Sequence, residues 1–128
     1  MSTPANLKYS KTHEWIKLEG TNATVGITGH AQEALGDITF VELPKVGAET
    51  KKDAACCVIE SVKAASDINA PVSGNVSEVN GTLETAPESV NKDPYGAGWI
   101  FKLSEVNSSD AAALMDSKAY DAFVESEK

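Results

Sequence analysis

The segment Glu60–Val76, ESVKAASDINAPVSGNV, contains one lysine between two runs that favour β-strands. Ala54–Val62 becomes strand-like toward its end, and Ile68–Val72 is the next strand-like run. The link between them is short and contains no Gly, Asn or Pro. The two runs therefore predict a β-hairpin or a sharp corner with Lys63 near its tip. A lysine there presents a flexible, accessible amine, but position alone fits an ordinary surface lysine equally well.

Short strand-like runs separated by turn signals occupy most of the first hundred residues. The expected strands are residues 15–18, 23–27, 38–43, 74–79 and 99–103. The residues between the first two runs predict a hairpin turn, and a short helical piece is expected at 30–35, ended by Gly36. Many short strands at close spacing predict a small barrel or sandwich.

The C-terminal part of the chain changes to helical patterning. Ser108–Asp110 is a capping sequence for a helix over residues 111–115, and residues 118–125 place apolar side chains at helical spacing. We expect two short helices, or one broken helix, on the outside of the β body.

Composition excludes several classes of protein. The chain has 128 residues, which suits one domain, and a formal net charge of −8 from 19 acidic residues and 11 lysines. Such a surface repels phosphate backbones, so no nucleic-acid partner is expected; it suits partners with basic surfaces, or serves solubility alone.

No apolar run approaches the roughly 18–20 residues that span a bilayer. The N-terminus resembles neither a signal nor a transit peptide, so we predict a cytoplasmic protein, or a matrix protein if the chain is a processed mitochondrial one.

The two cysteines, Cys56 and Cys57, are adjacent. Adjacent side chains on a strand point to opposite faces, so we expect one thiol in the core, one on the other face, and no disulfide between them. Free thiols indicate a reducing compartment. The two histidines and two cysteines do not have the spacing of a metal site, and no nucleotide-binding or nucleophile-elbow motif occurs.

Two glycines add to the lysine pattern: Gly47 lies sixteen residues before Lys63 and Gly74 lies eleven after it. This pattern resembles the lipoyl/biotinyl carrier domains, and residues 60–76 are similar to the lipoyl-attachment segment of the glycine cleavage system H-protein family. Similar motifs of that family occur at residues 13–15, 25–28, 30–32, 35–38, 40–44 and 94–99. The resemblance covers roughly residues 7–124.

The resemblance implies a mainly β fold, the lipoyl/biotinyl-type barrel-sandwich hybrid of two quasi-symmetric sheets. Short helices are expected near residues 30–35 and at the C-terminus. We expect residues 1–128 to form a single lipoyl-carrier domain, with a C-terminal helical extension at about 108–126, and the protein to be a monomer.

The resemblance also implies a function. Lys63 would carry lipoic acid through an amide bond on Nζ, added by a lipoyl-attaching enzyme. The P protein (glycine decarboxylase) would load an aminomethyl group, the T protein (aminomethyltransferase) would pass its carbon to tetrahydrofolate, and the L protein (dihydrolipoamide dehydrogenase) would reoxidise the dithiol. The protein is then a carrier and cosubstrate and not an enzyme.

An S-aminomethyl cargo breaks down in water, so a carrier of it needs a sheltering cleft with an anionic partner for the amine. Glu14 and Asp67 are the candidate carboxylates, with Thr12 and His30 as further candidates. The position of Glu14 near the arm is implied by the resemblance, and Asp67 follows Lys63 by four residues. Alternatively, both acids are solvated charges or turn formers, and the histidine is structural.

Four other readings use the same lysine or fold. Lipoyl domains of 2-oxo acid dehydrogenase acyltransferases usually carry Asp before the lysine, and biotin carboxyl carriers carry Met on both sides. Here Val62 and Ala64 flank Lys63. A lipoyl-relay protein, which hands lipoate to other proteins, would use Lys63 in the same way, and a cofactor-free binding protein would use only the fold.

Overall fold

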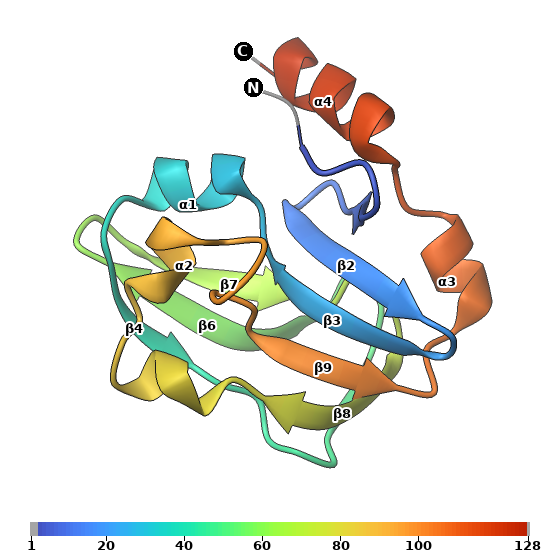
Figure 1. Cartoon of the computed structure of the whole chain (residues 1–128), viewed down its shortest axis with the longest axis horizontal. Helices are drawn as coiled ribbons and strands as arrows, with labels where there is room; N and C mark the ends of the chain where they lie inside the picture. The colour runs from blue at the N-terminus through green and yellow to red at the C-terminus, as the bar shows by residue number, and fades with distance from the viewer. Residues whose placement is uncertain (1–2, 128) are drawn as a thin grey trace.

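The computed structural model describes residues 3–127 and contains two antiparallel sheets (Figure 1). One sheet has six strands in the order β1-β2-β3-β9-β8-β5, and the other has three in the order β4-β6-β7. The strands are β1 (Lys8–Tyr9), β2 (Glu14–Glu19), β3 (Asn22–Ile27), β4 (Ile38–Glu42), β5 (Glu49–Thr50), β6 (Ala55–Ser61), β7 (Ala65–Asn69), β8 (Gly74–Val79) and β9 (Phe101–Ser104). The predicted mainly β fold of two sheets is confirmed.

Short helices connect and flank these sheets. They are α1 (Gly29–Leu35), the 3-10 turn η1 (Gly81–Glu84), α2 (Ser89–Lys92), α3 (Ser108–Ala112) and α4 (Ser117–Ser126). Thr28 caps the start of α1, and Gly36, at φ 80°, ends it as predicted. No helix within residues 3–127 is long and apolar enough to cross a membrane.

The main core lies between the two sheets and is built from alternating strand residues. Val25, Ile59, Ile68, Phe101 and Leu103 are all at most 1% exposed and belong to one apolar cluster. Side chains of a strand alternate between faces, so each sheet directs one set of residues into this layer. Burial of this layer is the main source of stability for the β body.

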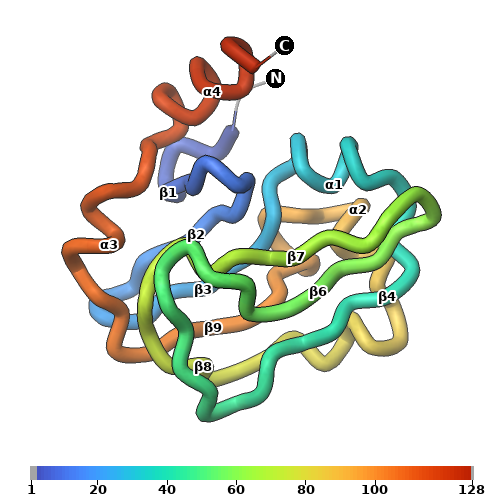
Figure 2. The backbone as a smooth tube through the Cα atoms, turned by 180° about the vertical axis from the view of Figure 1, so that it is seen from behind, coloured from blue at the N-terminus to red at the C-terminus, as the bar shows by residue number. Residues whose placement is uncertain are grey.

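A second, smaller cluster lies where the chain ends meet. Leu7, Tyr9, Trp15 and Tyr120 pack together and attach α4 to the six-stranded sheet. Figure 2 shows α4 beside β1 and the N-terminal segment, apart from the three-stranded sheet. Gly26 is required under this cluster, because a Cβ there would lie 2.6 Å from the Trp15 ring.

Two details differ from the expectations drawn from sequence. The strand after Lys63 begins at Ala65 rather than Ile68, since Ser61 closes the turn within a few residues. The first C-terminal helix begins at Ser108 because Asn107, and not the Ser108–Asp110 segment, caps it. A second helix, α4, follows it separately, capped by Asp116, which agrees with the expectation of two short helices.

The cysteines show the effect of a register shift. Cys57 is buried, while Cys56 is half-buried and packs against the same core cluster. Strict alternation would place Cys56 wholly on the outer face, but the pairing of β6 with β7 shifts between Ala55 and Cys57. Both thiols are free, as expected.

Candidate functional site

The tip of the β6–β7 hairpin is a tight turn fixed by one serine. The Ser61 amide donates to the Ala64 carbonyl at 2.8 Å. The Ser61 hydroxyl oxygen accepts hydrogen bonds from the amides of Lys63 and Ala64, both at 3.2 Å. A hydroxyl side chain thus satisfies the turn amides, which explains how the chain reverses here with no Gly, Asn or Pro.

Lys63 projects from this turn beside the end of α1. Its side chain is exposed, and a Cβ built on Gly36 would lie 3.4 Å from the Lys63 Cε. The neighbouring Val62 amide donates to the Asp37 carbonyl at 3.0 Å, which ties the tip to the segment after α1. Lys63 forms no ion pair with any residue between 3 and 127. The backbone of the tip is therefore held firmly while the amine stays accessible.

Glu14, at the start of β2, is buried at 2% exposure and held by several donors. Its Oε1 accepts from the Ser10 hydroxyl at 2.7 Å and from the Thr12 hydroxyl. Its Oε2 accepts from the Asn69 amide, at the end of β7, at 3.2 Å. Burial raises the pKa of Glu14 above its ordinary value, and the hydrogen bonds from Thr12, Ser10 and Asn69 only partly oppose that rise.

The other predicted site residues differ in their relation to Glu14. Thr12 is exposed and covers the Glu14 carboxyl from the outside. His30 is exposed on α1, and its ring centroid is 4.7 Å from that of His13, the neighbour of Glu14. Asp67 is exposed on β7, next to the buried Ile68, and within residues 3–127 no hydrogen bond joins it to Glu14. Thr12 therefore contacts the Glu14 carboxyl directly, His30 lies beside the neighbouring His13, and Asp67 does neither within residues 3–127.

Sequence reasoning missed the residues that support Glu14. No motif in the sequence indicates Ser10, although it lies only four residues before Glu14. Its hydroxyl oxygen also accepts a hydrogen bond from the Glu14 amide at 3.0 Å. Tyr120 lies more than a hundred residues away, and its hydroxyl is 2.8 Å from His13 Nδ1. Spacing between Ser10 and Glu14 gives a local signal, whereas nothing local indicates the contribution of α4.

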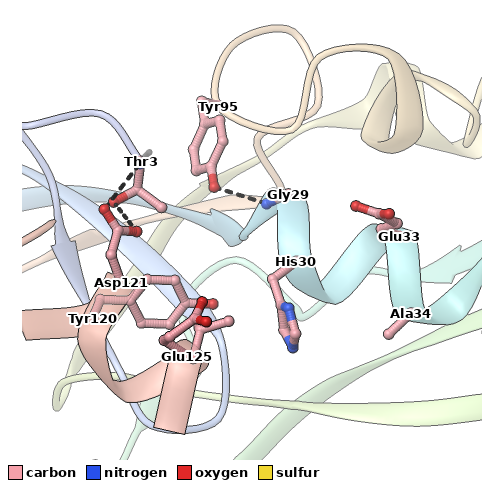
Figure 3. Close-up of a pocket in the computed structure, with 10 residues that line it drawn as sticks. Thr3, Gly29, His30, Glu33, Ala34, Tyr95, Tyr120, Asp121 and Glu125 are labelled. Carbon is pink, nitrogen blue, oxygen red and sulfur yellow. Dashed lines mark hydrogen bonds between the residues drawn. The ribbon is translucent and has the colours of Figure 1, made fainter. Parts of the chain in front are cut away.

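A pocket of about 590 Å³ lies between α1 and α4 (Figure 3). Tyr95 and Gly29 form one wall, where the Gly29 amide donates to the Tyr95 hydroxyl at 2.8 Å. Figure 3 shows Asp121 of α4 bonded to Thr3 on the opposite side. The pocket opens along α1, whose far end adjoins Lys63.

A β body of two sheets that displays a lysine on a fixed hairpin tip defines the class of carrier proteins, which hold a cargo on a lysine-borne arm. Residues 7–127 match the family model of the glycine cleavage H-protein, and the chain belongs to that family. The chain is 57% identical over 119 residues to the glycine cleavage system H protein of Laribacter hongkongensis, covering 92% of this chain and 94% of that protein. It is 55% identical over 127 residues to that of Klebsiella pneumoniae, covering 98% of each.

A solved structure agrees with these relatives. The crystal structure of a glycine cleavage system H protein from Mycobacterium marinum matches with a TM-score of 0.85 and 37% identity, covering 94% of this chain and 97% of that one. The resemblance drawn from sequence motifs is thus confirmed. The protein has the lipoyl-carrier role of the glycine cleavage system, as a carrier and not a catalyst, and works with the other proteins of that system. This assignment replaces the alternative of an acyltransferase lipoyl domain.

Proposed function

We propose that Lys63 carries lipoic acid as an amide on Nζ and that this arm shuttles the aminomethyl group of glycine. The observation that carries the proposal is the Ser61-fixed tip, which presents an exposed and unpaired amine. The surroundings fit such a group, because Gly36 leaves room beside the lysine stem and Val62, at 68% exposure, offers apolar surface to an apolar chain. The lipoyl group, when attached, supplies the disulfide that accepts the cargo.

Four enzymes have to reach this tip in turn. We propose that a lipoyl-attaching enzyme modifies Lys63, that the P protein loads the arm, that the T protein unloads it, and that the L protein reoxidises it. An exposed tip on a rigid hairpin suits all four, because each needs the lysine or its arm inside its own active site. Tethering converts each delivery into a local search at high effective concentration.

We further propose that the carrier works as one monomeric domain in the cytoplasm. The family model spans residues 7–127, which supports one unit, with α3 and α4 as its C-terminal extension. The free thiols of Cys56 and Cys57 suit a reducing compartment.

We propose that Glu14 is the anionic partner of the cargo amine. A carboxylate whose charge is disfavoured by burial gains more from an incoming ammonium group than an exposed one does. Thr12 lies over this carboxyl and is the residue that an arriving amine would displace. The loss of its hydrogen bond would then be offset by the new ion pair.

The length of the lipoyl-lysine arm favours a path that runs from Lys63 back along β7. Ala65 to Asn69 covers about 13 Å of strand, and the Asn69 amide contacts Glu14. A lipoyl-lysine arm extends roughly 12–15 Å, so its end arrives at Glu14 only when the arm follows β7. Asp67 lies midway along this path and faces solvent, and we propose that it contacts the arm near the entrance to the cleft.

Intact-mass measurement tests the attachment. Protein produced in lipoate-fed cells should gain one lipoyl increment, and Lys63→Ala should gain none. Lys45→Ala, another exposed lysine in a turn, is the matched control and should be modified like the parent. A lipoyl increment that persists in Lys63→Ala would refute the attachment site.

Exchange of labelled CO2 with glycine tests the shuttle. The lipoylated protein added to the P protein should stimulate exchange, and the Lys63→Ala protein should leave it at background. Absence of stimulation by the lipoylated form would count against the shuttle and favour the lipoyl relay, which transfer of the lipoyl group to an acceptor domain would then reveal.

A further inference from the structure

We propose that Tyr120 of α4 is a positioning residue for the cargo site: its hydroxyl holds His13 and thereby fixes the turn Ser10–Glu14, here called the Glu14 turn. The inference extends the proposed role of Glu14 and rests on it for its functional meaning. It concerns a residue that touches neither the arm nor the cargo and acts through the turn that presents the carboxyl.

Tyr120 lies at the junction of three elements. It is 1% exposed, and its hydroxyl is 2.8 Å from His13 Nδ1 and 2.8 Å from the Thr28 hydroxyl. Its ring stacks on Tyr9 with centroids 4.8 Å apart and an interplanar angle of 19°. The hydroxyl is therefore fixed in direction by its own ring packing and connects α4 to the Glu14 turn and to the cap of α1.

The hydrogen-bond donors at this junction form one consistent chain. Thr28 Oγ1 accepts from the Ala31 amide at 3.2 Å, which leaves its hydroxyl proton for Tyr120. Tyr120 can then donate to His13 Nδ1, and the proton of neutral His13 lies on Nε2, 3.6 Å from Glu127. Burial and the nearby His30 lower the pKa of His13, against the opposing effect of Glu127, so the neutral form required by this chain is favoured.

The Glu14 turn needs such support because its backbone is strained at His13. His13 has φ 72°, in the left-handed region that a residue with a Cβ rarely adopts. Its amide donates to the Ser10 carbonyl at 3.2 Å, and its carbonyl accepts from the Thr28 amide at 3.0 Å. The Ser10 amide donates to the Glu14 carbonyl at 2.9 Å and closes the turn. Fixing the imidazole therefore holds both ends of the turn that carries Glu14.

Other contacts also attach α4 to the β body. The Tyr120 hydroxyl can therefore be removed without detaching the helix. Tyr9 and Met115 exchange two backbone hydrogen bonds, of 2.8 and 2.9 Å, just before α4. The Phe123 ring lies 6.1 Å from that of His13. Removing only the Tyr120 hydroxyl should leave α4 docked and release the imidazole.

Tyr120→Phe tests this, with Tyr9→Phe as the matched control. The Tyr9 hydroxyl donates to the Pro4 carbonyl and not to the Glu14 turn, and its ring belongs to the same cluster. Tyr120→Phe should raise amide hydrogen exchange at His13 and Glu14 roughly five- to tenfold. It should also lower the pKa of Glu14, followed through its side-chain carbon by NMR, and speed ammonia release from the aminomethyl-loaded protein. Tyr9→Phe should change none of these.

A second variant keeps the inference testable if Tyr120→Phe folds poorly. His13→Gly tolerates the positive φ and removes the imidazole while Tyr120 stays intact, so by itself it should raise exchange at Glu14 as Tyr120→Phe does. Where Tyr120→Phe folds, adding it to His13→Gly should not increase exchange at Glu14 further. Fully additive effects would overturn the inference, as would parent-like exchange and Glu14 titration in Tyr120→Phe. Failure of the proposed cargo role of Glu14 gives a different result. The loaded Glu14→Ala protein would then release ammonia at the parent rate, even if Tyr120→Phe changes amide exchange and the titration of Glu14.

Discussion

The hairpin tip and the Glu14 turn are both short chain reversals organised by a serine hydroxyl. They differ in what they do with the functional side chain: the tip exposes Lys63, whereas the Glu14 turn buries its carboxyl. At the tip, the Ser61 hydroxyl bonds, among residues 3–127, only to groups of Lys63 and Ala64, and Lys63 is left exposed. At the Glu14 turn, Ser10 bonds to a carboxyl that is also held from β7, and the neighbouring His13 contacts Tyr120 of α4. The turn at the tip is closed by local hydrogen bonds, with the Val62–Asp37 bond tying it to the segment after α1, whereas the Glu14 turn depends on contacts from two distant elements, β7 and α4.

The largest expected effect tests the dependence of the Glu14 turn on α4. Tyr120→Ala should destabilise the protein by about 3–5 kcal/mol, because it empties a buried aromatic site. Val62→Ala at the tip, where the side chain is 68% exposed, should change the free energy of unfolding by less than about 0.5 kcal/mol. Urea unfolding of both variants measures the difference between the two losses of stability. Similar losses in Tyr120→Ala and Val62→Ala would contradict the expected difference between the two regions.

A second test compares function in the two regions. Glu14→Ala should leave lipoylation of Lys63 intact, because the carboxyl lies at the opposite end of the hairpin from the tip. It should speed ammonia release from the loaded protein about tenfold, by loss of a charge-assisted bond to the amine. Glu78→Ala, an exposed acid on β8, is the control and should release ammonia like the parent. Equal rates in Glu14→Ala and the parent would contradict the proposed role.

A third test uses pH. Because burial lowers the pKa of His13, the unfolded chain takes up a proton near pH 6.5 before the folded protein does. Stability from this group is therefore lost as pH falls below about 6.5, and the loss should be about 1 kcal/mol or less. Urea unfolding at pH 7.5 and pH 5.5 measures it. His13→Asn, which tolerates positive φ, should show a smaller decrease between these two values, and an equal decrease would exclude His13 as its source.

The smallest effect is expected at the tip. Ser61→Ala removes the hydroxyl that accepts two turn amides, and should cost about 0.5–1 kcal/mol, since the freed amides turn to water. Hydrogen exchange at Lys63 and Ala64 should rise without change at Glu14. Ser66→Ala on the adjacent strand provides the comparison. Increased exchange at Glu14 in Ser61→Ala would mean that the two regions are coupled.

The same contrast explains what the sequence could predict. Strand patterns and the lone lysine predicted the hairpin and its tip, and the motifs predicted the family, because these signals are local. The start of β7 was misplaced because Ser61 replaced the usual turn residues. Glu14 was selected through the resemblance, but its burial and its partners were not predicted. The Glu14 carboxyl accepts from Asn69, and the neighbouring His13 contacts Tyr120; these two residues lie 55 and 106 positions beyond Glu14 and carry no pattern of their own.

The missing side chain of Gly36 bears on the timing of the carrier. A Cβ there would stand in van der Waals contact with the Lys63 stem, 3.4 Å from Cε, and its absence leaves more space for that stem to change rotamer. Rotamer changes of exposed side chains take picoseconds to nanoseconds, far less than the encounter of two proteins. Reorientation of the lysine stem therefore adds nothing measurable to the time of each delivery.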